Sequence, residues 1–143
     1  MPRRYITAIE QRQIIERSQR RCEYCQCPVD YTSQSFVCEH IVPVAKGGKT
    51  ALNNLALACG GCNNHKYTKV EAIDPHSSAS IALYNPRQDK WQTHFAWSDD
   101  TLQMVGMTAT GRATINALSL NRPGVINIRR LLHMADLHPP NDE

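Results

Sequence analysis

The first regular spacing of apolar positions lies at residues 7–20 and predicts an α-helix. Thr7, followed three residues later by Glu10, forms a capping box, which is a sequence signal of a helix start. Four isoleucines give this segment a partial apolar stripe: Ile6, Ile9, Ile14 and Ile15. Arginines fill much of the remaining surface, at positions 12, 17, 20 and 21. This basic face either contacts phosphate groups or is solvated while the apolar stripe packs on the rest of the protein.

Between residues 35 and 70 the pattern predicts a strand, a loop and a short helix. Residues 35–44 form the strand, and Pro43 ends it because proline cannot donate to a sheet. Residues 46–49, Lys-Gly-Gly-Lys, form a loop with two cations and little bulk, which either approaches a phosphate backbone or is a simple turn. A short helix is expected to begin near Cys62 and to run through Lys66 toward Val70.

The second half of the chain predicts a hairpin and two helices after a break. Residues 71–80 are rich in Pro and Ser and are interpreted as a linker. The expected elements that follow are a strand and turn at 81–87, strands at 91–97 and 101–108, helices at 111–120 and 125–135, and a frayed tail at 138–143. The fold class is therefore α+β. We expect residues 1–70 to hold the N-terminal helix and the cysteine-rich module, and residues 81–138 to form an extension packed on or beside it.

Composition fits an ordinary globular protein. The chain has 143 residues, of which 41% are hydrophobic and 20% charged, and it has no run near the ~20 apolar residues of a membrane span. The start of the chain is positively charged, but no apolar segment follows, so a secretory signal is not predicted. We therefore expect a cytoplasmic protein without membrane association. In that compartment six cysteines are more often metal ligands or free thiols than disulfides.

Charge is unevenly distributed along the chain. Residues 1–70 carry ten Lys and Arg against five acidic residues, whereas residues 71–143 carry six against eight. The basic half is also the half that holds all six cysteines, so a polyanionic partner there is plausible. The alternative is a set of solvated surface charges. The C-terminal arginines at 112, 122, 129 and 130 either extend such a footprint or form a solvated helix face.

Two Cys-x-x-Cys pairs are the strongest chemical signal. Cys22 and Cys25 form the first pair, and Cys59 and Cys62 form the second after a gap of 33 residues. Two such pairs are typical of a tetrahedral Zn²⁺ site, and a closed four-cysteine site stabilises a fold without doing chemistry. Cys27 could replace Cys25 as a ligand, although small core residues or free thiols are the expected roles of the two further cysteines, at 27 and 38.

Between and after these pairs lie residues suited to acid–base and metal chemistry. Glu39 and His40 are adjacent on the predicted strand, and strand alternation would send their side chains to opposite faces. Both can serve one site only if the strand bends or lies at a corner between strand and helix. Asn63 to Lys66 add further polar groups at a helix start.

Taken together, these motifs resemble the HNH family of nucleases, in its variant with a four-cysteine zinc. The resemblance covers about residues 20–70 and rests on a set of spaced motifs: Glu39-His40-Ile41-x-Pro43, Gly47-Gly48, Asn54-Leu55 and Cys59-x-x-Cys62-Asn63-x-x-Lys66. It implies a ββα-metal module, two strands and a helix that hold one divalent ion. The segment around residues 85–114 is similar to an extension of some small bacterial proteins, for which no role is implied.

The resemblance also implies roles for individual residues. His40 resembles the general base that activates water. Asn54 resembles the residue that holds the loop and orients His40. Glu39 and Asn63 resemble the ligands of the catalytic ion, at positions where the family often has Asp and His. Lys66 would meet phosphate. His65 has three candidate roles: a third ligand, a phosphate contact or a solvent-facing helix residue.

Chemistry agrees with these roles and defines the expected function. A neutral imidazole titrates near physiological pH and suits a base, and carboxylate and amide oxygens suit Mg²⁺ or Mn²⁺ rather than zinc. We therefore expect a metal-dependent endonuclease that hydrolyses DNA phosphodiesters, with structural Zn²⁺ and catalytic Mg²⁺ or Mn²⁺. Lys46, Lys49, Lys66 and Lys69 are the expected DNA contacts. The alternatives are a zinc-stabilised nucleic-acid-binding module without catalysis and a zinc protein that binds a partner. Cutting both strands requires either a homodimer or two sequential nicks by a monomer, so the oligomeric state stays open.

Further along the chain, His94 stands between two tryptophans. Trp91 and Trp97 either stack on bases with His94 or pack a small second core.

Overall fold

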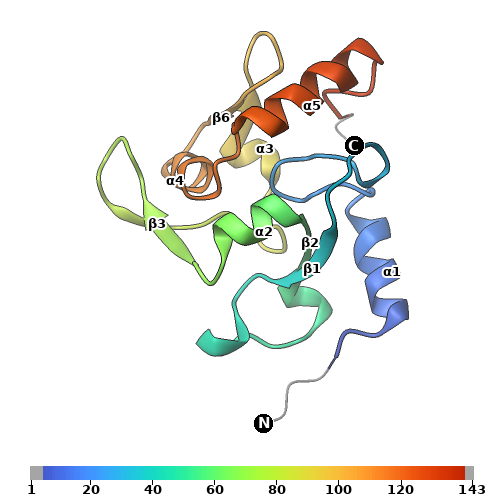
Figure 1. Ribbon diagram of the computed structural model, residues 1–143. Coiled ribbons are helices and arrows are strands. Elements are labelled where there is room, and N and C mark those ends of the chain that lie inside the picture. The colour runs from blue at the N-terminus through green and yellow to red at the C-terminus, as the bar shows by residue number, and fades with distance from the viewer. Residues whose placement is uncertain (1–4, 141–143) are drawn as a thin grey trace.

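The computed structural model describes residues 5–140, arranged as Figure 1 shows. The first half contains α1 (Ala8–Arg17), η1 (Val29–Tyr31), β1 (Phe36–His40), η2 (Val44–Lys46), η3 (Leu52–Asn54), β2 (Leu55–Cys59) and α2 (Gly60–Lys66). The second half contains β3 (Glu71–Ile73), β4 (Ser80–Ala82), α3 (Trp91–His94), β5 (Phe95–Trp97), β6 (Met104–Gly106), α4 (Ala109–Leu118) and α5 (Pro123–Met134). Within residues 5–140 the strands pair into three two-stranded antiparallel sheets, β1–β2, β3–β4 and β5–β6. The α+β class is therefore confirmed.

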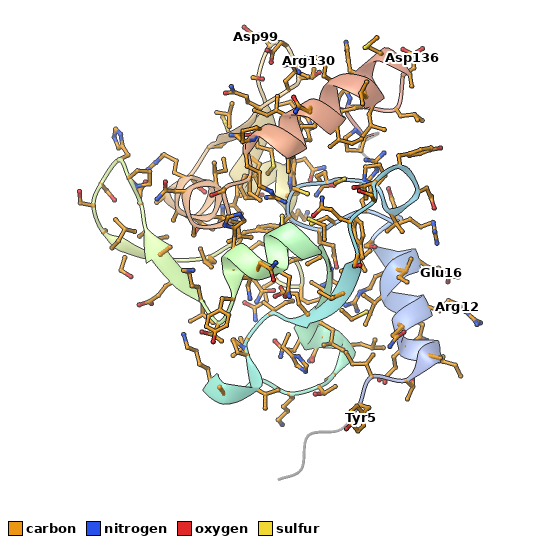
Figure 2. The ribbon with its side chains drawn as sticks, viewed as in Figure 1. Tyr5, Arg12, Glu16, Asp99, Arg130 and Asp136 are labelled. Carbon is orange, nitrogen blue, oxygen red and sulfur yellow. The ribbon has the colours of Figure 1, made fainter. Side chains whose placement is uncertain are left out.

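Helix α1 begins as predicted but ends earlier. The Thr7 hydroxyl accepts from the Glu10 N–H at 3.1 Å, and the Glu10 carboxylate accepts from the Thr7 N–H at 3.0 Å, so the capping box is complete. Gln19 and Arg20 have positive φ, which ends the helix at Arg17 rather than at residue 20. Arg12 lies on the outward face of α1 (Figure 2), so part of the basic face is exposed.

Strands β1 and β2 and helix α2 form one ββα unit that positions the candidate site. The two strands pair with His40 opposite Leu55 and Phe36 opposite Cys59, and α2 follows β2 directly and packs on both strands. Every residue of β2 is buried, which explains its unbroken run of small and apolar side chains. The strand predicted over residues 35–44 ends at His40, because the chain turns there toward η2.

Four predictions for the second half need correction. Residues 71–80, interpreted as a linker, form β3, a turn and the start of β4, because Asp74 accepts the backbone N–H groups of the turn. Only the last three residues of the strand predicted over 91–97 are extended, since the first four form the helical turn α3. Thr108 caps α4, so that helix begins two residues earlier than expected. His138, placed in the frayed tail, is buried and bonds to Thr101; residues 141–143 lie outside the described part of the chain.

The extension and the ββα unit share one hydrophobic core. Buried side chains from both halves form a single cluster, which includes Tyr24, Ile41, Ala58, Tyr84, Phe95 and Leu118. Trp91 and Trp97 pack against this cluster, and their rings lie 5.3 Å apart. The tryptophans therefore pack within the protein, but on the core shared by both halves rather than on a small second core. The division of the chain at residues 70 and 81 stays a prediction.

No helix in the described part of the chain is both long enough and apolar enough to cross a membrane.

Candidate active site and zinc centre

Two short turns bring the four predicted zinc ligands together. Cys22 and Cys25 lie on a turn closed by the backbone hydrogen bond from Gln26 N–H to the Cys22 carbonyl, 3.0 Å, and Gln26 has a positive φ. Cys59 is the N-cap of α2, where its sulfur accepts from the N–H of Cys62 at 3.5 Å. The four sulfur atoms are buried and lie within 4.8 Å of one another.

This cluster has the geometry of a tetrahedral zinc site. Zn–S bonds of about 2.3 Å in a tetrahedron place the sulfurs about 3.8 Å apart, and the Cys25 and Cys59 sulfurs are 3.7 Å apart. The donor set therefore fits a zinc ion that all four thiolates hold. Cys27 is buried close to the first pair and Cys38 is partly buried; neither forms a disulfide, and neither belongs to the four-cysteine group.

Glu39, His40 and Asn63 line one hollow at the end of β1, together with Val37, Cys38, Pro43 and Tyr67. Strand alternation alone would separate Glu39 from His40. They reach the same hollow because β1 ends at His40, where the chain turns, and α2 contributes Asn63 from the other side. The hollow therefore assembles the three central residues of the predicted catalytic site.

Hydrogen bonds fix His40 and its loop. The Nε2 atom of His40 lies 2.8 Å from the Thr50 hydroxyl. Asn54 bridges the loop: its amide oxygen accepts from Val42 N–H at 2.9 Å, and its amide nitrogen donates to the carbonyls of Val42 and Lys49 at 3.0 and 2.9 Å. The predicted loop-holding contacts of Asn54 are thus present.

Gly48 allows the loop to close this tightly. A Cβ atom at that position would lie 1.7 Å from the Val42 carbonyl oxygen. Gly47 has a φ of 90°, a conformation that favours glycine. Both glycines of the motif are therefore required by the backbone, while the flanking Lys46 and Lys49 are exposed.

A buried ion pair joins Glu39, which lines the hollow, to Lys66. Glu39 and Lys66 are 6% and 1% exposed, and the Lys66 ammonium lies 3.2 Å from the carboxylate. The ammonium also donates to the Ile41 carbonyl at 2.8 Å, and the Tyr24 hydroxyl donates to the other carboxylate oxygen of Glu39. Burial raises the pKa of Glu39, and Lys66 opposes part of that shift.

Burial changes the interpretation of Lys66. The sequence predicts a phosphate contact, but its ammonium is enclosed and committed to Glu39 and to a carbonyl. A direct contact with DNA is therefore not available to it in this arrangement. Its observed contacts are those of a residue that positions Glu39.

Other predicted site residues lie on the surface around the hollow. His65 and Lys69 are exposed, and the Lys69 ammonium donates to the His65 carbonyl at 2.9 Å. His65 does not line the hollow, which favours its solvent-facing role over the ligand role. Within residues 5–140, the four cysteines are the single group of three or more Cys, His, Asp or Glu side chains that converge as metal ligands do.

Sequence patterns did not identify two residues of the site. Tyr24 lies inside the first Cys-x-x-Cys pair and approaches Glu39 only after the turn that carries this pair packs onto β1. Thr50 follows the Lys-Gly-Gly-Lys loop and meets His40 only when that loop closes. Their sequence position carries no signal of either contact.

Three of the four C-terminal arginines are held by contacts within the protein, although the Arg112 side chain stays 33% exposed. Arg112 makes a bidentate contact with the buried Asp74, at 2.9 Å for each bond, and lowers the pKa of that carboxyl. Arg122 contacts the cysteine cluster. Arg129 is buried, which lowers its pKa to about 10. Arg130 alone of the four is exposed.

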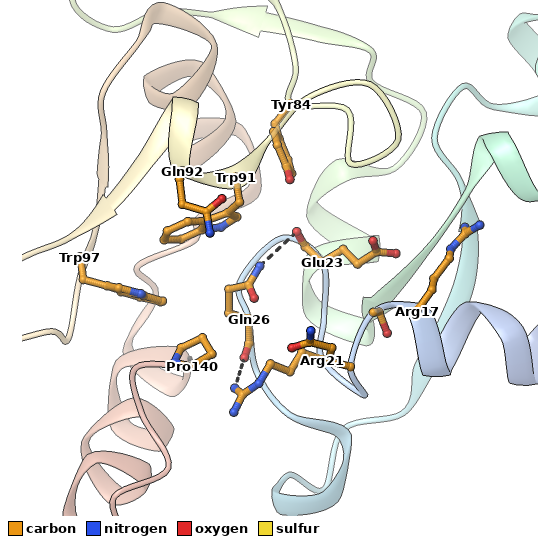
Figure 3. A pocket seen from close by; sticks show the side chains of 11 residues that line it. Arg17, Arg21, Glu23, Gln26, Tyr84, Trp91, Gln92, Trp97 and Pro140 are labelled. Atoms are coloured by element: carbon orange, nitrogen blue, oxygen red, sulfur yellow. Dashed lines mark hydrogen bonds between the residues drawn. The ribbon is translucent and has the colours of Figure 1, made fainter. Parts of the chain in front are cut away.

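A second hollow lies between the loop that carries the first Cys-x-x-Cys pair and the extension (Figure 3). Trp91 and Trp97 lie on one side of it, and Arg21 and Gln26 lie on the other. On its wall, an ion pair joins Glu23 to Arg87 of the extension. Its residues come from different elements than those around His40, so it is a separate feature of the interface.

Comparison with known proteins places the ββα unit in context. Residues 22–69 match the family model described as HNH endonuclease, and the clustered cysteines of this segment fit the zinc-binding variant of that domain. The chain is also similar to the Septu protein PtuB of Bacillus thuringiensis, with 29% identity over 111 residues. That alignment covers 76% of this chain and 40% of the relative, so the chain spans less than half the length of that protein. No solved structure matches the chain significantly.

Proposed function

We propose that the protein is a metal-dependent endonuclease that hydrolyses DNA phosphodiester bonds at the hollow formed by Glu39, His40 and Asn63. The observation that carries the proposal is the convergence of a base, a carboxylate and an amide in one hollow of an HNH domain. An imidazole beside oxygen ligands is the set that phosphodiester hydrolysis requires.

His40 acts as the general base in this proposal. Its Nε2 atom lies against the Thr50 hydroxyl, and the neutral ring takes a proton from water. Asn54 keeps the loop that carries Thr50 closed over the imidazole. The orientation of the base therefore depends on the loop as well as on β1.

Glu39 and Asn63 would hold Mg²⁺ or Mn²⁺, because both offer hard oxygen donors toward the hollow. When bound, such an ion neutralises charge that develops on the phosphate. With two protein ligands, water would complete most of the coordination shell. The zinc in the cysteine cluster would hold the fold.

The exposed lysines 46, 49 and 69 would contact the phosphate backbone around the hollow. Each such contact releases counterions, so binding should weaken as salt rises.

A plasmid cleavage assay tests the proposal. The wild type should cut DNA when Mg²⁺ or Mn²⁺ is added, and His40→Ala should abolish cleavage while DNA binding persists. The matched control is His65→Ala, since this exposed histidine lies outside the hollow, and it should retain most of the activity. Gel separation of nicked from linear products also distinguishes single-strand from double-strand cutting.

A second candidate function is a zinc-stabilised nucleic-acid-binding module without catalysis. The Glu39 carboxylate is already held by Lys66 and Tyr24, and this favours a structural role for it. Salt-dependent DNA binding with no cleavage under any divalent ion would support this candidate and refute the nuclease.

A further inference from the structure

The extension reaches into the zinc centre through Arg122. Its guanidinium lies 3.5 Å from the Cys59 sulfur and 3.6 and 3.7 Å from the Cys62 sulfur, within range of N–H···S hydrogen bonds. The same group donates to the carbonyls of Leu118 and Ser119 at 3.3 and 3.2 Å. Arg122 therefore ties the end of α4 to the second cysteine pair, 60 residues earlier in the chain.

Gly61 makes room for this contact. A Cβ atom on Gly61 would lie 2.4 Å from Nη2 of Arg122 and 3.0 Å from its central carbon. The guanidinium thus rests directly on the backbone between the two cysteines of the pair. Any larger residue at this position would push the arginine away from the sulfurs.

Arg129 approaches the first cysteine pair. It is 2% exposed, and it donates to the Cys25 carbonyl at 3.3 Å. Its other acceptors are also neutral: the Leu102 and Leu120 carbonyls and the Asn121 amide oxygen. Among residues 5–140, no carboxylate pairs with this buried cation.

Charge balance explains why a buried arginine lies beside the cysteine cluster without a carboxylate partner. Four thiolates around one Zn²⁺ carry a net charge of about −2, since each ligand is deprotonated. A buried charge is expensive without a counter-charge. Arg122 and Arg129 together supply two positive charges, one beside each cysteine pair.

We propose that Arg122 and Arg129 are positioning residues of the zinc centre, and that they couple zinc binding to docking of the extension (residues 81–138). Donors to the sulfurs stabilise the thiolate form that binds the metal, so the docked extension slows zinc loss. Coupling is reciprocal, so bound zinc holds the extension in place. The inference rests on the zinc part of the proposed function and not on catalysis.

Zinc transfer to a chromophoric chelator tests the coupling. With the full chain purified in the zinc-bound form, Arg122→Ala should lower zinc affinity about 10- to 100-fold and speed its release. Arg122→Lys keeps the charge but cannot span two sulfurs, so it should recover part of that loss. Arg130→Ala is the matched control, because Arg130 is exposed on the outer face of α5 (Figure 2) and donates to Asn127 of the same helix at 3.2 Å.

Gly61→Ala provides an independent perturbation that leaves every charge in place. It should speed zinc release toward the Arg122→Ala rate and increase amide hydrogen exchange in residues 81–138. The inference is overturned if both variants release zinc within about twofold of Arg130→Ala, or if the wild type binds no zinc. A wild type that cuts no plasmid under any divalent ion would refute the nuclease alone, while faster zinc release from Arg122→Ala and Gly61→Ala would still support the coupling.

Discussion

Lys66→Met removes the cation that faces the buried Glu39 carboxylate. The methionine keeps most of the volume of the lysine stem, so the change isolates the charge. Glu39 is 6% exposed and keeps only the Tyr24 hydroxyl as a partner for its side chain among the contacts seen in the wild type. A buried carboxylate without its cation should destabilise the fold, or be protonated instead.

The expected magnitude follows from the burial of both partners. Removal of one member of a buried pair typically costs about 3–5 kcal/mol. For 143 residues, an unfolding entropy of about 0.3 kcal/mol/K converts this to a Tm lowered by roughly 10–17 °C. Lys69→Met, at an exposed lysine on the same segment, should change the unfolding free energy by no more than about 0.5 kcal/mol.

The cost should also depend on pH, with a sign that the pKa of Glu39 determines. Burial holds that pKa above its unfolded value, so the carboxyl favours folding most when protonated, and this contribution falls as pH rises through the folded pKa. Without Lys66 the pKa rises further. The penalty of Lys66→Met should therefore be small near pH 4 and full near pH 8.

Denaturant unfolding of the zinc-bound protein, without added Mg²⁺, measures these differences. Glu39→Gln in the Lys66→Met background should recover much of the lost stability, because it removes the unpaired charge. A cost below about 1 kcal/mol that does not vary with pH would refute the ion pair as a contact that stabilises the fold.

Three further predictions concern the base, its loop and the hairpin of the second half. Thr50→Val should lower the single-turnover cleavage rate about 10- to 100-fold with unchanged DNA affinity, because His40 loses the hydrogen bond to the Thr50 hydroxyl; Thr50→Ser should retain activity, and equal rates for both variants would contradict the role. Asn54→Ala removes three hydrogen bonds and should lower the unfolding free energy by about 2–3 kcal/mol, with faster hydrogen exchange over residues 42–49; protection equal to that of the wild type would contradict this. Arg112 holds the pKa of Asp74 well below its ordinary value, so this pair stabilises the fold above about pH 4 and the benefit is lost as pH falls through the folded pKa. Asp74→Asn should therefore flatten the acid limb of a plot of stability against pH, and an unchanged limb would refute this assignment.

Local sequence patterns predicted several elements of the fold and the residues of both candidate sites. The capping box placed the start of α1, and the β6 and α5 segments follow from their apolar spacing. Two Cys-x-x-Cys pairs specified the cysteine cluster, because a tetrahedral ion constrains the spacing of its ligands so strongly. Glu39, His40 and Asn63 were identified by their order and spacing as one motif, and the hollow brings the three together.

Only the tertiary structure revealed the features that depend on contacts between residues distant in the chain. Lys66 and Arg129 look like surface cations in the sequence, yet both are buried, because their partners include Glu39 of β1 and the Cys25 carbonyl, which are far away in the chain. The segment 71–80 has the composition of a linker, but Arg112 and Asp74 hold it as a hairpin. No periodicity predicts that Arg122 reaches the sulfurs, because that contact exists only after the extension docks over Gly61. Sequence alone thus identified the candidate groups for the chemistry, and packing determined which charges surround them.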